Sequence, residues 1–206
     1  MNNLNAAAEN TEETKKLKTT SIVLGLGLVA LAIISRLVPH PWNFTAIGAT
    51  GLFAGYFAGS GISRFEKLGF LALPFVGLFL SDWILGFHSI MVYTYFGLAF
   101  SVILGRLSGT NSDWPKWLEW TGQSFISSTL FYMVTNFGVW FTGGLYPRSF
   151  DGLMQSFVAG IPFYGYQVAG DLFYLSAIIL VCIYFRVPQR RMIARQNILV
   201  ENGLSC

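Results

Sequence analysis

The chain has 206 residues, of which 53% are hydrophobic and only 11% are charged, and its formal net charge is +3. A soluble domain carries about 25% charged residues, so this composition argues against a soluble enzyme and indicates an integral membrane protein. The charge is too small to favour a nucleic-acid partner, and the two cysteines, Cys182 and Cys206, imply no disulfide framework.

The first segment, residues 1–19, is polar and contains three glutamates. A secretory signal peptide would instead begin with a short basic stretch and a brief apolar core. We therefore expect residues 1–19 to form a disordered cytoplasmic tail that leads into the first apolar segment.

Six apolar segments follow, and each is long enough, or nearly long enough, to cross a bilayer as a helix of about 20 residues. They cover residues 20–38, 44–60, 68–87, 90–107, 120–142 and 166–186. The predicted fold class is therefore all-α, with a bundle of six transmembrane helices over residues 20–187. A basic cytoplasmic tail, residues 188–206, completes the chain.

The distribution of lysine and arginine predicts the orientation, because cytoplasmic segments are enriched in both. With a cytoplasmic N-terminus, 11 of the 13 basic residues fall on the inside, and only Arg36 and Arg148 fall outside. Six spans then place both termini in the cytoplasm. This pattern predicts a multi-pass protein of the cytoplasmic membrane.

The second apolar segment carries Gly51, Gly55 and Gly59 at steps of four residues. Such a ladder of small residues lets another helix approach closely in lipid. It is explained either by packing within the bundle or by docking of a partner subunit.

In this orientation, the outer ends of the segments hold most of the unusual residues. Irregular, proline- and glycine-rich backbone at membrane depth is tolerated where it is buried in protein or lines a wet cavity. Residues 143–165 are too long and too aromatic for a plain turn, so we expect a re-entrant or lid-like segment there.

Ionisable residues inside membrane segments are costly and mark candidate functional sites. Asp82 and Asp171 lie near the outer ends of their segments, and Arg36 closes the first segment. One interpretation is that Arg36 pairs with Asp82 and clips two helices together. The other is that these groups, with Arg148, surround a polar pocket that opens to the exterior.

Helical spacing favours the pocket, because polar and aromatic residues share a face in two segments. In one segment these residues are Thr129, Tyr132, Asn136 and Trp140, and in the other they are Gln167, Asp171 and Tyr174. Aromatic faces with a few polar tips suit a flat organic ligand. Tryptophan and tyrosine also collect at membrane interfaces, which is the interpretation we favour for Trp42, Tyr93 and Tyr146.

No motif for catalysis, phosphate binding or metal binding is found, so the sequence predicts a protein that is not an enzyme and needs no cofactor or metal. Whether His40 or His88 binds a metal stays open. An acid/base pair of Asp82 and His88 is the enzymatic alternative, and it requires the two side chains within hydrogen-bond reach.

Four motifs in order, RLVPHPWNF, LSDWILGFHS, NFGVWFTGGLYP and GIPF…GD, resemble a family of largely uncharacterised bacterial membrane proteins with the pattern RLxPHPxNF…SDxxLGFH…TNFGVW…LYP. The resemblance covers about residues 30–180. That family is in turn similar in size and layout to the substrate-binding (S) components of energy-coupling-factor vitamin transporters. The resemblance implies an outward-facing ligand pocket and a transmembrane coupling subunit driven by ATPases. It also implies location in a bacterial inner membrane.

The sequence thus suggests a substrate-capture component for uptake of a small vitamin-like nutrient. Its expected partners are the nutrient, the lipid bilayer and a coupling subunit. A nucleic-acid partner is not expected. A scaffold subunit that docks through Gly51, Gly55 and Gly59 is the alternative. The residues expected to bind the substrate are Asn43, Asp82, His88, Asn136, Trp140, Arg148 and Asp171.

Overall fold

The computed structural model describes residues 2–59, 64–108 and 116–185, and in these ranges it contains six α-helices and no strand. The all-α prediction is thus confirmed for the described part of the chain, where each expected apolar segment overlaps one of the helices. The helices are α1 (Asn2–Leu37), α2 (Ile47–Ala58), α3 (Arg64–Leu85), α4 (Met91–Leu107), α5 (Lys116–Thr142) and α6 (Phe150–Tyr184).

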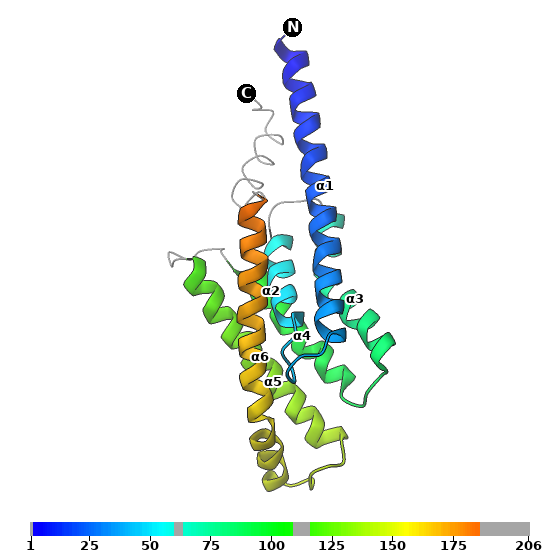
Figure 1. The fold of residues 1–206 in the computed structure, drawn as a ribbon, viewed down its shortest axis with the longest axis vertical. Helices are drawn as coiled ribbons and strands as arrows, with labels where there is room; N and C mark the ends of the chain where they lie inside the picture. Colours follow the sequence, from blue (N-terminus) through cyan, green and yellow to red (C-terminus); the bar gives the residue numbers. More distant parts are fainter. Residues whose placement is uncertain (1, 60–63, 109–115, 186–206) are drawn as a thin grey trace.

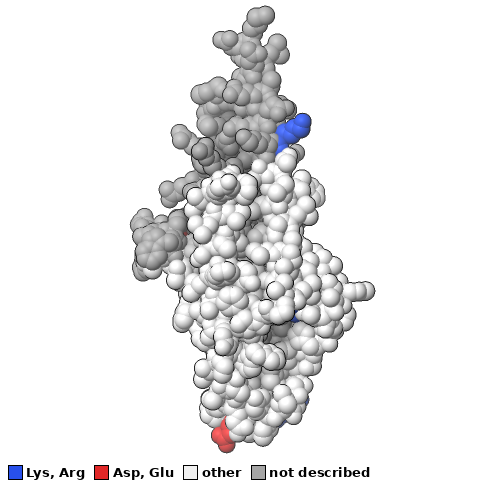
Figure 2. Space-filling model, in the orientation of Figure 1, with Lys and Arg blue, Asp and Glu red and all other residues white. Residues whose placement is uncertain are grey.

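In the part of the chain that the structure describes, three apolar helical stretches are long enough to cross a membrane, namely Thr19–Leu37 within α1, α3 and α6. Large apolar side chains on these helices face outward, for example Ile22 and Trp83, which are 62% and 70% exposed. Figure 2 shows one face of the molecule that is almost free of acidic and basic side chains along its middle. These features are those of a membrane protein, since exposed apolar surface of this extent is unusual in soluble chains.

Helix α2 lies in the centre of the bundle and contacts each of the other five helices (Figure 1). Ten of its 12 residues are buried. A helix that is apolar on all sides is stable only when it is surrounded, which explains its central position. Since its first and last residues, Ile47 and Ala58, are buried, the unpaired backbone groups at both ends of α2 need partners from within the protein.

The glycines of α2 pack within the bundle. A side chain on Gly51 would collide with residues of α4, and one on Gly55 would collide with the α4 backbone at Val102. Gly105 of α4 faces the α2 backbone in the same way. Gly59 is the C-terminal cap of α2. For Gly51 and Gly55 this agrees with the first of the two explanations, packing within the bundle, because α4 occupies the face that a partner subunit would need.

Helix α1 extends back to Asn2, whereas the sequence suggests a disordered tail over residues 1–19. Nine of these 19 residues are alanine, glutamate or lysine, which are good helix formers, and they let the stretch continue the apolar helix that follows. The expected basic tail, residues 188–206, lies outside the described residues.

Helix α6 begins at Phe150, so residues 150–165 form no separate lid or re-entrant segment; this corrects the expectation for residues 143–165. Ser149 caps the helix, and its side chain accepts a hydrogen bond from the backbone N–H of Gly152. Asp151 places a negative charge in the first turn, which favours the helix N-terminus. Pro162 is accommodated inside the helix, as is common in membrane helices.

The start of α1 and the end of α6 point to the same end of the bundle (Figure 1). The connections 38–46, 86–90 and 143–149 lie toward the other end. Three of the four sequence motifs include these connections, so the fold gathers parts of the motifs into one region.

Candidate binding cavity

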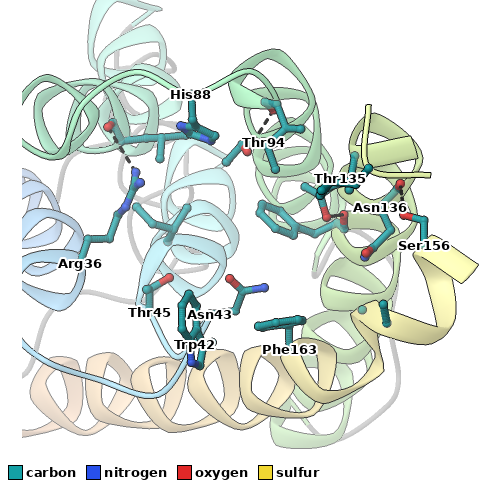
Figure 3. Close-up of a pocket in the computed structure, with 18 of the residues that line it drawn as sticks. Arg36, Trp42, Asn43, Thr45, His88, Thr94, Thr135, Asn136, Ser156 and Phe163 are labelled. Carbon is teal, nitrogen blue, oxygen red and sulfur yellow. Dashed lines mark hydrogen bonds between the residues drawn. The ribbon is translucent and has the colours of Figure 1, made fainter. Parts of the chain in front are cut away.

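A partly open cavity of about 410 Å³ lies among these three connections and the helices that they join (Figure 3). Its wall combines hydroxyl, amide, imidazole and guanidinium groups with aromatic rings. The polar lining residues are Arg36, Asn43, Thr45, His88, Thr94, Thr135, Asn136, Tyr146 and Ser156, and the aromatic ones include Trp42, Phe131 and Phe163.

The turn Pro41–Phe44 presents two neighbouring side chains to the cavity. The backbone N–H of Phe44 donates to the carbonyl of Pro41 at 3.0 Å. Asn43 has a φ of 61°, a left-handed conformation that asparagine adopts more readily than most residues. In this conformation Asn43 lines the cavity, where the sequence analysis expects it. Trp42 lines it too, and its ring stands edge-on to Phe163 of α6 with the centroids 5.9 Å apart.

Asn136 of α5 lies on the side of the cavity opposite to Arg36 (Figure 3). Its Nδ2 donates one hydrogen bond to the carbonyl of Tyr132 at 2.8 Å, one turn back in the same helix. This bond orients the amide and leaves one N–H and the carbonyl oxygen for a ligand. Ser156 of α6 donates to the backbone carbonyl of Asn136 at 2.8 Å and so holds α5 and α6 together at this point.

Arg36 and Asp82 form an ion pair beside the cavity, with Nη2 2.7 Å from Oδ1. The side chain of Asp82 is 0% exposed and does not line the cavity, whereas that of Arg36 is 16% exposed and does. Nη1 of Arg36 also donates to the hydroxyl of Ser81 at 3.0 Å. The pairing of Arg36 with Asp82, the first of the two interpretations, is thus present. Of the four groups in the pocket interpretation, Arg36 lines the cavity, whereas Asp82, Arg148 and Asp171 do not.

His88 lines the cavity from the connection 86–90. No hydrogen bond or ion pair joins it to Asp82 among the described residues, so an acid/base pair of these two groups has no support from the geometry. His40 lies in another connection, where its Nδ1 is 2.7 Å from the carbonyl of Pro41. In the described ranges no three histidine, cysteine or acidic side chains gather as a metal site would require.

Trp140 and Arg148 do not line the cavity, although the sequence places both in the site. Nε1 of Trp140 donates to the carbonyl of Pro147 at 2.9 Å. Arg148 donates to the carbonyl of Phe141 at 3.0 Å, and its guanidinium lies 5.2 Å from the centre of the Phe141 ring. Both side chains therefore fold the connection 143–149 back onto the end of α5.

Asp171 of α6 does not line the cavity either. It is 2% exposed and faces the N-terminus of α2. Its Oδ2 accepts a hydrogen bond from the hydroxyl of Ser128 at 2.7 Å, and its carboxylate also accepts one from the backbone N–H of Ala49. Gly48 leaves space for the carboxylate, because any side chain there would collide with it. Asp171 thus caps α2 from another helix, where the helix dipole favours a negative charge.

The face of α5 that lines the cavity differs from the one that the spacing suggests. Phe131, Thr135 and Val139 line it at steps of four residues, with Asn136 beside them. The expected neighbours of Asn136 on its own face instead contact α6: the hydroxyl of Thr129 lies 2.8 Å from that of Tyr164, and Tyr132 donates to the carbonyl of Phe157.

On α6, the lining residues come from the part of the helix before residue 166, where the sequence suggests a lid. A sequence signal for this extension exists, since Ser149 followed by Asp151 is a typical helix start. The missed residues on this helix are Ser156, Ala159, Gly160 and Phe163.

Comparison with known proteins identifies one match. The model described as "Family of unknown function (DUF6580)" matches residues 15–193. No curated protein and no solved structure matches the chain. The match agrees with the predicted relation to an uncharacterised family, and the similarity to energy-coupling-factor S components stays a prediction.

Proposed function

The chain belongs to the DUF6580 family of unknown function, and we propose that it captures a small nutrient in this cavity for uptake across a membrane. In this proposal all six helices lie in a bacterial inner membrane, both termini are cytoplasmic, and the cavity opens to the outside. The start of α1 and the end of α6 lie toward the end of the bundle opposite the cavity, so a cytoplasmic start of α1 would leave the cavity on the outer side.

The observation that carries the proposal is the convergence of motif residues on one cavity. Asn43, His88 and Asn136 come from three different motifs and lie more than 40 positions apart in sequence, and all three line it. Ligand pockets typically measure about 300–1,000 Å³ and combine apolar walls with a few polar groups. The volume of about 410 Å³ lies in this range.

A coupling subunit driven by ATPases is the partner that the similarity to S components implies. The surface for such a partner would differ from the glycine face of α2, which packs against α4. The large apolar side chains exposed on α1, α3 and α6 offer helix surfaces that a membrane partner could cover.

The proposal is tested by mass spectrometry of small molecules that co-purify with the protein, followed by binding measurements on the purified chain in nanodiscs. We expect Asn136→Ala to weaken binding at least about tenfold, as loss of one or two hydrogen bonds implies. Thr142→Ala, on the same helix but outside the cavity lining, should leave binding unchanged. Equal affinity in the folded Asn136→Ala variant would contradict the proposal.

A further inference from the structure

The charges around the cavity are unevenly distributed. Among the described residues, its lining contains the guanidinium of Arg36 and the imidazole of His88 but no aspartate or glutamate. Asp82 is the nearest acidic partner of Arg36 and is fully buried behind it. A molecule in the cavity therefore meets a cation and neutral hydrogen-bonding groups, and it meets no carboxylate.

Arg36 retains hydrogen-bonding capacity after its protein contacts are made. A guanidinium has five N–H donors. Three contacts are present, one each to the carbonyl of Leu78, the hydroxyl of Ser81 and the carboxylate of Asp82. Both N–H groups of Nη1 thus have acceptors, and Nη2 pairs with Asp82, so among the described residues at least two N–H groups are left for a ligand, the number that a carboxylate accepts in a paired arrangement. The three protein contacts also hold the guanidinium in place, so little side-chain entropy is lost when a ligand binds.

The rest of the wall suits a flat, apolar body. Trp42 and Phe163 contact each other edge to face on one side, and Phe131 lines the cavity from α5. Figure 3 shows Arg36 on one side of the cavity and the Asn136 amide on the other, with Trp42 and Phe163 between them along the lower edge. An anionic group and a ring can therefore be accommodated together.

We propose that the cavity is selective for a small organic anion, an aromatic or heteroaromatic carboxylate, whose carboxylate binds Arg36 and whose ring lies beside Trp42, Phe131 and Phe163. This inference rests on the proposed capture function and specifies its substrate class. Asp82 has two roles in it: its contact orients the guanidinium, and its negative charge competes with the ligand for the same cation.

The competition makes a prediction with a definite sign. Asp82→Asn removes the competing charge at nearly constant shape, so it should tighten the binding of a carboxylate severalfold. The same substitution should leave the binding of a neutral ligand unchanged. A cationic ligand would bind more weakly, because its attraction to Asp82 would be lost.

The experiment uses the full-length protein in nanodiscs and matched pairs of probes, benzoate with benzamide and indole-3-acetate with indole-3-acetamide. Phenyl phosphate distinguishes a phosphate from a carboxylate preference. Binding is measured by calorimetry for the wild type, Asp82→Asn and the double variant Arg36→Gln/Asp82→Asn. The double variant removes both charges, so it leaves no unpaired buried ion that could prevent folding.

We expect the wild type to bind at least one carboxylate about tenfold more tightly than its amide, Asp82→Asn to increase this preference, and the double variant to lose it. Equal binding of both members of each pair by the wild type would overturn the inference, as would an unchanged preference in the folded double variant. Tighter binding of phenyl phosphate than of every carboxylate would overturn the carboxylate assignment. Failure of every carboxylate probe to bind would do the same.

The capture function itself has a separate readout. Asn136→Ala should weaken the binding of the carboxylate and the amide to a similar extent. If amides bind in an Asn136-dependent way without a carboxylate preference, the anionic class is wrong and the capture function stands. If every bound compound is insensitive to Asn136→Ala, the capture function fails as well.

Discussion

The amide of Asn136 lies directly against Gly160, so that any side chain at residue 160 would occupy the space of the amide group. The two residues belong to different helices, α5 and α6, and both line the cavity. The glycine therefore allows a polar group to enter the wall between two closely packed helices.

Gly160→Ala should displace the Asn136 amide and weaken the binding of the aromatic carboxylate probes about tenfold, since one oriented hydrogen-bonding group is lost. Calorimetry on the nanodisc-embedded protein measures this change. Gly165→Ala is the matched control, because it lies on the same helix and a side chain there would meet open space. Equal effects of the two substitutions would show that Gly160 has no special relation to the site.

Gly55→Ala should destabilise the fold, because its side chain would collide with the α4 backbone, which cannot rotate away. Overpacking of this kind costs about 1–3 kcal/mol. Thermal unfolding of the detergent-solubilised protein should begin at a lower temperature. Gly27→Ala, where a side chain meets no atom of the chain within 4 Å, should be neutral or slightly stabilising. A partner-docking role for Gly55 would instead leave the unfolding temperature unchanged.

Asp171→Ala should lower stability without changing the carboxylate preference of the cavity. The substitution removes the acceptor for the Ser128 hydroxyl and for the N–H of Ala49 at the start of α2. Loss of a helix cap costs about 0.5–2 kcal/mol, which thermal unfolding detects. Asp151→Ala, at an exposed position in the first turn of the same helix, should have a smaller effect. A changed ratio of carboxylate to amide affinity in Asp171→Ala would place this residue in the binding site after all.

The proposed orientation predicts which side of the membrane each connection faces. In a background that carries Cys182→Ser and Cys206→Ser, we introduce Ser89→Cys in the connection 86–90 or Arg64→Cys at the start of α3. A membrane-impermeant maleimide should label the first variant in intact cells and the second only after permeabilisation. The reverse labelling pattern would invert the topology and place the cavity on the cytoplasmic side.

The positions of the helices are predictable from the sequence because the signal is local. Each apolar stretch is long enough to form a helix that satisfies its own backbone hydrogen bonds. The charged and polar residues between the stretches mark the helix ends. The starts of α1 and α6 are the exceptions. Residues 1–19 are polar, and residues 143–165 are rich in glycine, proline and aromatic residues, so neither stretch gives a clear helical pattern. The Ser149 cap indicates the correct start of α6.

The composition of the site is predictable only in part. Asn43 and His88 lie in connections that the sequence motifs identify. Asn136 is an amide within an apolar helix, so its residue type marks it. Asp171 is equally unusual in type, yet the structure uses it to cap α2. A buried carboxylate can serve a ligand or a helix end, and its position along its own helix does not distinguish these roles.

The sequence by itself determined the all-α class and the positions of the apolar helical segments, because hydrophobicity and length act within each segment. Only the tertiary structure decided which face of each helix meets a neighbour, which side chains pair, and which line the cavity. In a chain of this composition the outward and inward faces are both apolar, so the helical period carries little information about rotation. The pairing of Arg36 with Asp82 and the contact of Asn136 with Gly160 both depend on that rotation.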